Sequence, residues 1–257
     1  MEKKETKKIL ETLPHKYRIT LSKALEFAHN SFKENLCNIT LGGSGGKGNI
    51  IENWSDLDLY LILQKYNEKE VLNFMKNINK LDIHVGTTLY TVDEVNNNLI
   101  DCKTKIMCFE KQNYNVNPTL YGKDIFKKIT YIEVVENDLR NLPNVLHEIR
   151  RKYIDLMSDK NKKVTKPYIK KMLVLIKCIL NCHGVFSYGY YSSVEKIKKL
   201  IEKQNYYLTP IKQFDIIYSI KNIDDSKEDI LEFSSSLLKF VEYSIRRRER
   251  IKYGKKN

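Results

Sequence analysis

The spacing of hydrophobic and polar positions in the first half of the chain predicts a small sheet flanked by helices. Residues 5–36 carry apolar side chains at helical spacing, and Pro14 divides this segment into two helices. A third helix is predicted over residues 67–79. Short apolar or alternating runs predict strands over four segments: Asn38–Leu41, 56–63, 80–91 and 103–110.

The second half of the chain has helical periodicity throughout. Five helices are predicted, over residues 131–158, 166–183, 192–204, 209–220 and 226–252. The second of these is the clearest, because Pro167 suits its first turn and Gly184 its C-terminal end. Leu120–Asp124 is predicted to lead out of the first domain. We therefore expect an α+β domain over residues 1–128 and an all-α helical bundle over residues 129–257.

A glycine-rich turn joins the first two predicted strands. Glycine permits positive φ and lets the backbone approach a ligand closely, and amides at the start of a helix bind anions. Ser44 can donate its hydroxyl and Lys47 supplies a cation. The sequence therefore predicts a phosphate-binding turn, followed by a short helix before the second strand. Its glycines are Gly42, Gly43, Gly45, Gly46 and Gly48.

The second predicted strand carries two carboxylates on one face. Alternation places Asp56, Asp58 and Tyr60 together and four leucines on the opposite face. Two neighbouring carboxylates disfavour each other's ionised form, so a cation is expected beside them. Magnesium takes oxygen ligands and is often held by one or two carboxylates plus substrate phosphates. An anion-binding turn next to a metal-binding strand suits a nucleoside triphosphate bound with its metal.

This motif order matches neither the Walker loop, which ends in Lys-Ser or Lys-Thr, nor the dinucleotide fingerprint. Gly43-Ser44 followed by Asp56-Leu57-Asp58 closely resembles the signature of the DNA polymerase β-like nucleotidyltransferase superfamily. The resemblance implies a small mixed-sheet nucleotidyltransferase domain, two Mg²⁺ ions, and transfer of a nucleotide from an NTP to a hydroxyl, with release of pyrophosphate. ATP, and so AMP transfer, is the favoured donor. The two-part layout resembles the antibiotic-modifying, aminoglycoside-type nucleotidyltransferases, which join such a domain to a helical bundle.

The superfamily usually places a third carboxylate on the strand after the intervening helix, and Asp82 is the candidate here. The resemblance thus implies three catalytic and metal-binding residues, Asp56, Asp58 and Asp82. Asp82 could complete a second metal site or accept the proton of the acceptor hydroxyl. His84 is predicted to share its face and is the rival base.

The formal net charge of +13 favours anionic partners. Lys170 and Lys171 are candidate nucleotide-binding residues from the second domain, and Arg246–Arg250 is a candidate phosphate or RNA contact. A polycationic antibiotic would instead need a locally negative pocket, for which four acids are available: Glu133, Glu136, Asp138 and Glu148. The sequence therefore leaves three acceptors open: an antibiotic, an RNA or a partner protein. The alternative from another functional class is a nucleotide- or RNA-binding regulatory module on an inactive core.

The sequence predicts a cytoplasmic protein that does not enter a membrane. Its five cysteines are an odd number, which argues against a disulfide framework. The first residues lack the apolar core of a signal peptide. The longest apolar run, Met172–Leu180, contains Lys177 and is too short to span a bilayer.

Overall fold

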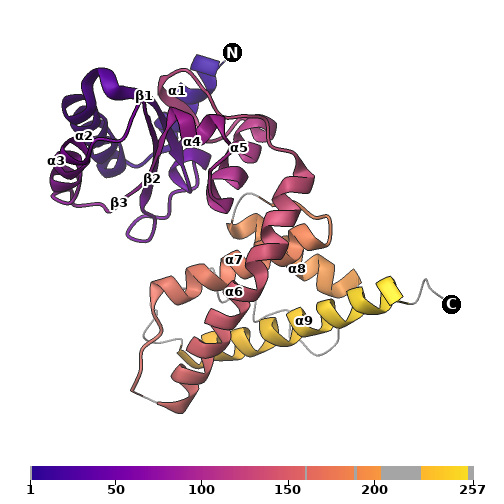
Figure 1. Ribbon diagram of the computed structural model, residues 1–257. Coiled ribbons are helices and arrows are strands. Elements are labelled where there is room, and N and C mark those ends of the chain that lie inside the picture. The colour runs from indigo at the N-terminus through magenta and orange to yellow at the C-terminus, as the bar shows by residue number, and fades with distance from the viewer. Residues whose placement is uncertain (1, 160, 188–189, 204–226, 254–257) are drawn as a thin grey trace. The chain divides into compact units, whose positions relative to one another are not determined.

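The computed structural model describes residues 2–159, 161–187, 190–203 and 227–253 (Figure 1). The helix predicted over residues 209–220 lies outside these ranges. The chain divides into two compact units, Met1–Val134 and Val135–Asn257. The first unit is mixed α and β, and the second is helical in its described residues, so the predicted α+β fold class is confirmed.

A four-stranded mixed sheet forms the centre of the first unit. Its strands are β1 (Leu36–Gly42), β2 (Leu57–Leu63), β3 (Val85–Thr91) and β4 (Thr119–Gly122), in the order β3-β2-β1-β4. β1 is antiparallel to β2 and β4, whereas β2 and β3 are parallel. Asp58 pairs with Gly42 on one side and Gly86 on the other. The C-terminal end of β1 and the N-terminal ends of β2 and β3 therefore lie at the same end of the sheet.

Helices cover both faces of this sheet (Figure 1). α2 and α3 pack on the apolar face, where the four leucines of β2 are fully buried, and α4 and α5 lie on the face that carries Asp58. Tyr90 of β3 fastens α5 to the sheet, because its hydroxyl lies 3.0 Å from Oγ1 of Thr104 and accepts the amide of Asp101. The helices are α1 (Glu2–Thr12), α2 (His15–Phe32), the short η1 (Lys33–Asn35), α3 (Glu68–Ile78), α4 (Val92–Asn96) and α5 (Cys102–Tyr114).

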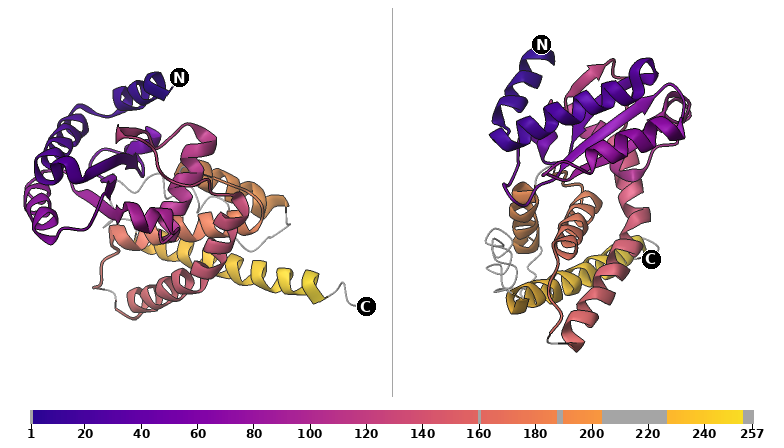
Figure 2. Two further views of the ribbon diagram at one scale, coloured as in Figure 1. Left: turned by 45° about the horizontal axis from the view of Figure 1, so that its top comes forward. Right: turned by 90° about the vertical axis from the view of Figure 1, so that its left-hand side faces the viewer.

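The second unit consists of helices in the residues that the structure describes. α7 packs against α8 and α9 (Figure 2), and the hydroxyl of Tyr168 donates to Oγ of Ser234 at 2.8 Å. Pro167 lies in the first turn of α7 and Gly184 follows it with φ of +75°, as predicted. No described helix is long and apolar enough to cross a membrane. The helices are α6 (Tyr131–Ser158), α7 (Lys166–Cys182), α8 (Tyr190–Lys203) and α9 (Lys227–Tyr253).

Three elements differ from the prediction. Residues 103–110, predicted as a strand, belong to α5, whose first turn is capped by Asp101: its carboxylate accepts the amide of Thr104 at 2.6 Å. The strand predicted from residue 80 begins only at Val85, after a bend at residues 81–83. Residues 119–122, which overlap the predicted exit Leu120–Asp124, add a fourth strand beside β1.

Candidate active site

The glycine turn lies directly against the carboxylate of Asp58. Gly43 has φ of +60°, and a Cβ atom at this position would overlap with Oδ2 of Asp58. A Cβ atom at Gly42 would overlap with the ring of Tyr60, which follows Asp58 on the same face of β2. Only glycine lets the turn approach the strand so closely. The predicted phosphate-binding turn and the predicted metal-binding strand are therefore in contact.

The turn continues through Ser44 into a single 3₁₀ turn, η2 (Gly45–Lys47), which ends at Gly48 with φ of +68°. The amide of Asn49 donates to the carbonyl of Ser44 at 2.9 Å and closes the loop. The short helix expected before the second strand is present only as this single 3₁₀ turn, because residues 49–56 form turns and irregular backbone.

Asp56 directly precedes β2 and is held from the side of α2. The hydroxyl of Tyr17 donates to the carbonyl of Ser55 at 2.9 Å, and Oγ of Ser55 accepts the amide of Ile51. Burial raises the pKa of Tyr17, and the nearby charge of Asp56 raises it further. These bonds fix the backbone just before Asp56 and so define the position from which β2 begins.

Lys47 does not present its charge to a phosphate in this structure. Its ammonium lies 2.8 Å from the carboxylate of Glu110 on α5, and the two side chains are only 11% and 2% exposed. Glu110 also accepts Nδ2 of Asn117 at 3.3 Å. The amide of Asn117 in turn donates to the carbonyl of Gly46 at 2.6 Å. Lys47 thus fastens η2 to α5, and its role as a phosphate ligand stays a prediction.

Asp58 is paired with a cation that the sequence analysis did not identify. Nζ of Lys103, in the first turn of α5, lies 2.8 Å from Oδ1 of Asp58 and 6.0 Å from the ring centre of Tyr60. Burial raises the pKa of Tyr60, and the charge of Asp58 raises it further. The prediction missed Lys103 because it treated residues 103–110 as a strand. Asp101 as an N-cap was the signal that could have placed this lysine at a helix start.

Asp82 does not lie on the third strand. It is exposed, in the bend that precedes β3, and the described chain contains no group of three His, Cys, Asp or Glu side chains that could hold a metal. His84 is also exposed but lies closer to the pair, since its carbonyl accepts the amide of Leu57 between Asp56 and Asp58. β3 offers Gly86 beside Asp58, where a built Cβ would lie 3.4 Å from Oδ1.

The residues of the second unit that were predicted to contact nucleotide, phosphate or RNA all lie on described helices or at their ends. Lys170 and Lys171 lie on α7, and Lys171 forms an ion pair with Glu148 at 2.6 Å. Arg246 pairs with Glu242, whereas the side chains of residues 247–250 lie outside the described part.

The four acids expected to form a negative pocket each have a local partner. Hydrogen bonds from Thr130 lower the pKa of Glu133, Glu136 lies 4.0 Å from Arg140, and Glu148 pairs with Lys171. Asp138 is buried and accepts Nδ2 of Asn181 at 2.5 Å.

The donor set at the start of β2 fits a magnesium ion. Asp56, directly before β2, and Asp58, within it, offer carboxylate oxygens, which are the ligands that this ion prefers. Asp58 already attracts a cation, the ammonium of Lys103. With two carboxylates, the remaining ligands would come from phosphate oxygens and water.

Comparison with solved structures finds a fold similar to that of this chain. The chain matches the crystal structure of a spectinomycin adenyltransferase from Enterococcus faecialis with ATP and spectinomycin, with a TM-score of 0.60 and 11% sequence identity. The match covers 88% of this chain and 98% of that one. No protein-family model matches the chain, and neither does any curated protein sequence.

Proposed function

We propose that this chain is a magnesium-dependent nucleotidyltransferase that moves AMP from ATP to a hydroxyl group of its acceptor. The contact between Gly43 and the carboxylate of Asp58 is the main observation behind this proposal. It joins an anion-binding turn to a metal-binding carboxylate, as a triphosphate with its metal requires. The fold likeness to an adenyltransferase crystallised with ATP supports the same class of reaction.

In the proposed reaction the turn around Gly43 and Ser44 binds the phosphates. Asp56 and Asp58 would hold magnesium, which would supply positive charge to neutralise the triphosphate and the departing pyrophosphate. The acceptor hydroxyl attacks the α-phosphorus, an oxygen–phosphorus bond forms, and the bond between the α- and β-phosphates breaks. The hydroxyl proton passes to a base at the start of β3. His84 lies nearer to Asp56 along the strands than Asp82 does, and it is the first candidate.

Turnover with a panel of hydroxyl acceptors tests this proposal. Purified protein would be incubated with ATP, Mg²⁺ and either spectinomycin, other aminocyclitol antibiotics or tRNA, while pyrophosphate release is followed. We expect one acceptor to gain the mass of an AMP residue, and Asp56→Asn to abolish the reaction. ATP binding without pyrophosphate release for any acceptor would contradict the proposal.

A regulatory nucleotide-binding module is the second candidate. It is supported by the exposed position of Asp82 outside β3, since a carboxylate is missing where the superfamily usually has its third one. The net charge of +13 suits an RNA partner for such a module. Nucleotide binding without turnover, together with retention of RNA at moderate salt, would favour this candidate.

A further inference from the structure

Lys103 occupies the side of Asp58 where the proposed function needs a cation. Its ammonium lies 2.8 Å from Oδ1 of Asp58, while Gly43 borders Oδ2 of the same carboxylate. The side chain of Lys103 is 62% exposed and that of Asp58 is 26% exposed. The ion pair is thus open to solvent on the side of the lysine, whose long stem can adopt other rotamers.

The position of Lys103 in its helix is electrostatically unfavourable without Asp58. It is the second residue of α5, and the N-terminus of a helix carries partial positive charge that repels cations. The carboxylate of Asp101 is directed to the amide of Thr104 as the cap of this helix. The attraction to Asp58 therefore offsets a local repulsion, which makes this ion pair different from an incidental surface contact.

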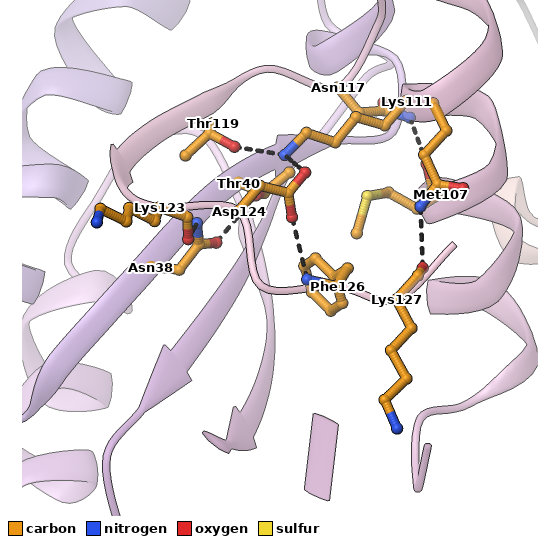
Figure 3. Close-up of polar contacts among 11 residues, drawn as sticks. Asn38, Thr40, Met107, Lys111, Asn117, Thr119, Lys123, Asp124, Phe126 and Lys127 are labelled. Carbon is orange, nitrogen blue, oxygen red and sulfur yellow. Dashed lines mark hydrogen bonds and ion pairs between the residues drawn. The ribbon is translucent and has the colours of Figure 1, made fainter. Parts of the chain in front are cut away.

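The backbone that carries Lys103 is held in place by the rest of α5. Figure 3 shows Lys111 of this helix bonded to Thr119 of β4, and its ammonium lies 2.8 Å from Oδ2 of Asp124. Nδ2 of Asn117 donates to the carbonyl of Met107 at 3.2 Å. With the helix fastened to the sheet, a change in what Lys103 binds requires only a change of its own side chain.

We propose that Lys103 is an exchangeable counter-ion, paired with Asp58 without metal and with the nucleotide phosphates when Asp58 binds magnesium. This inference rests on the proposed function. A divalent cation on Asp58 would repel the ammonium from the same oxygen, by the like-charge effect that governs neighbouring ionisable groups. The anion-binding turn begins at Gly43, in contact with Asp58, so the displaced ammonium finds phosphate close by. Lys103 would then weaken the binding of metal alone and strengthen the binding of metal together with nucleotide.

The test compares binding of metal alone with binding of ATP and metal in the full-length protein. Mn²⁺ alone would be measured by electron paramagnetic resonance of the free ion, and ATP with Mg²⁺ by calorimetry. In Lys103→Met we expect Mn²⁺ alone to bind roughly three- to tenfold more tightly and ATP with Mg²⁺ to bind roughly three- to tenfold more weakly. Lys103→Arg, which keeps the charge, should stay close to wild type in both.

Lys105→Met is the matched control, because it removes the same charge from the same helix, near Glu133 rather than Asp58. It should change neither affinity. If the affinities for Mn²⁺ alone and for ATP with Mg²⁺ both fall in Lys103→Met, the inference is overturned and the proposed function stays in place. The same holds if both affinities stay at the wild-type value. A wild-type protein that binds neither Mn²⁺ nor ATP with Mg²⁺ would overturn the proposed function and this inference with it.

Discussion

At the scale of single residues, the carboxylate of Asp58 is bordered by two glycines. Gly43 lies against Oδ2, and a Cβ atom at Gly86, its partner on β3, would lie 3.4 Å from Oδ1. Lys103 pairs with the same Oδ1. The lack of a side chain at Gly43 thereby lets the glycine turn lie directly against this acidic group.

Gly43→Ala tests whether the close approach of the glycine turn to Asp58 is needed for nucleotide binding. The new methyl group would displace the carboxylate of Asp58, and φ of +60° is unfavourable for alanine, so we expect ATP affinity in the presence of Mg²⁺ to fall about tenfold or more. Unfolding free energy should fall by about 1–2 kcal/mol from the backbone alone. Calorimetry and chemical denaturation measure the two effects.

Gly184→Ala is the matched control for Gly43→Ala. Gly184 has φ of +75° and no atom within 4 Å of a built Cβ, so alanine meets the same backbone penalty without a clash. It should lose a similar amount of stability and keep its nucleotide affinity. Equal losses of affinity in both variants would contradict a specific role for Gly43.

The raised pKa of Asp138 predicts that the stability of the second unit depends on pH. Burial raises its pKa, although hydrogen bonds from Asn181 and Cys178 oppose that shift. A raised pKa in the folded state means that the native protein binds the proton more tightly than the unfolded chain. Its contribution to stability is therefore full below the unfolded pKa and is lost as pH rises through the folded pKa.

Asp138→Asn removes this titration. Denaturant unfolding of both proteins from pH 4 to pH 8 should show the wild type losing stability relative to the variant as pH rises, by up to about 1.4 kcal/mol per pH unit within the window. A difference between the two proteins that is constant across this range would contradict the assigned pKa shift.

At the scale of elements, the periodic segments were predictable and the short or mixed ones were not. The strand that carries Asp58 and the helix pair divided at Pro14 are both formed. Each has a local signal, alternation in the strand and helical spacing in the helices. The fourth strand has only four residues, and it depends on pairing with β1, which the local sequence does not encode.

The misassigned helix α5 limited what could be predicted of the site. Ile106 to Phe109 is a continuous apolar run, which suits a buried strand as well as a buried helix. Met107 and Cys108 are buried, so tertiary packing rather than the local sequence determines that this run is helical. Lys103 and Glu110 therefore had no predicted place near the turn, although their partners Asp58 and Lys47 were both selected from the sequence.

The Lys47–Glu110 pair is predicted to hold η2 against α5. Because both side chains are nearly buried, removal of one partner leaves an uncompensated charge, and we expect Lys47→Met or Glu110→Gln to cost about 3 kcal/mol in chemical denaturation. The double variant should lose much less than the sum of the single losses. Glu11→Gln in the exposed Lys7–Glu11 pair should change stability by less than about 0.5 kcal/mol. Additive losses in the Lys47–Glu110 cycle would contradict direct coupling.

At the scale of the whole molecule, the likeness in fold is extensive and the charge is strongly positive. The likeness to a spectinomycin adenyltransferase covers 88% of the chain and so extends beyond the first unit. The net charge of +13 favours a polyanion. The four acids proposed for a polycation pocket are engaged locally, for example Glu148 with Lys171. All of these acceptors require the same nucleotide site, which makes that site the first thing to measure.

Calorimetric titration of ATP into the wild-type protein, with and without Mg²⁺, tests the central claim that the glycine turn and Asp58 form one metal–nucleotide site. We expect binding that requires Mg²⁺ and that weakens at least about tenfold in Asp58→Asn. Asp93→Asn, which removes one exposed carboxylate on α4, should bind as the wild type does. ATP binding that is independent of Mg²⁺, or unchanged in Asp58→Asn, would contradict the existence of such a site.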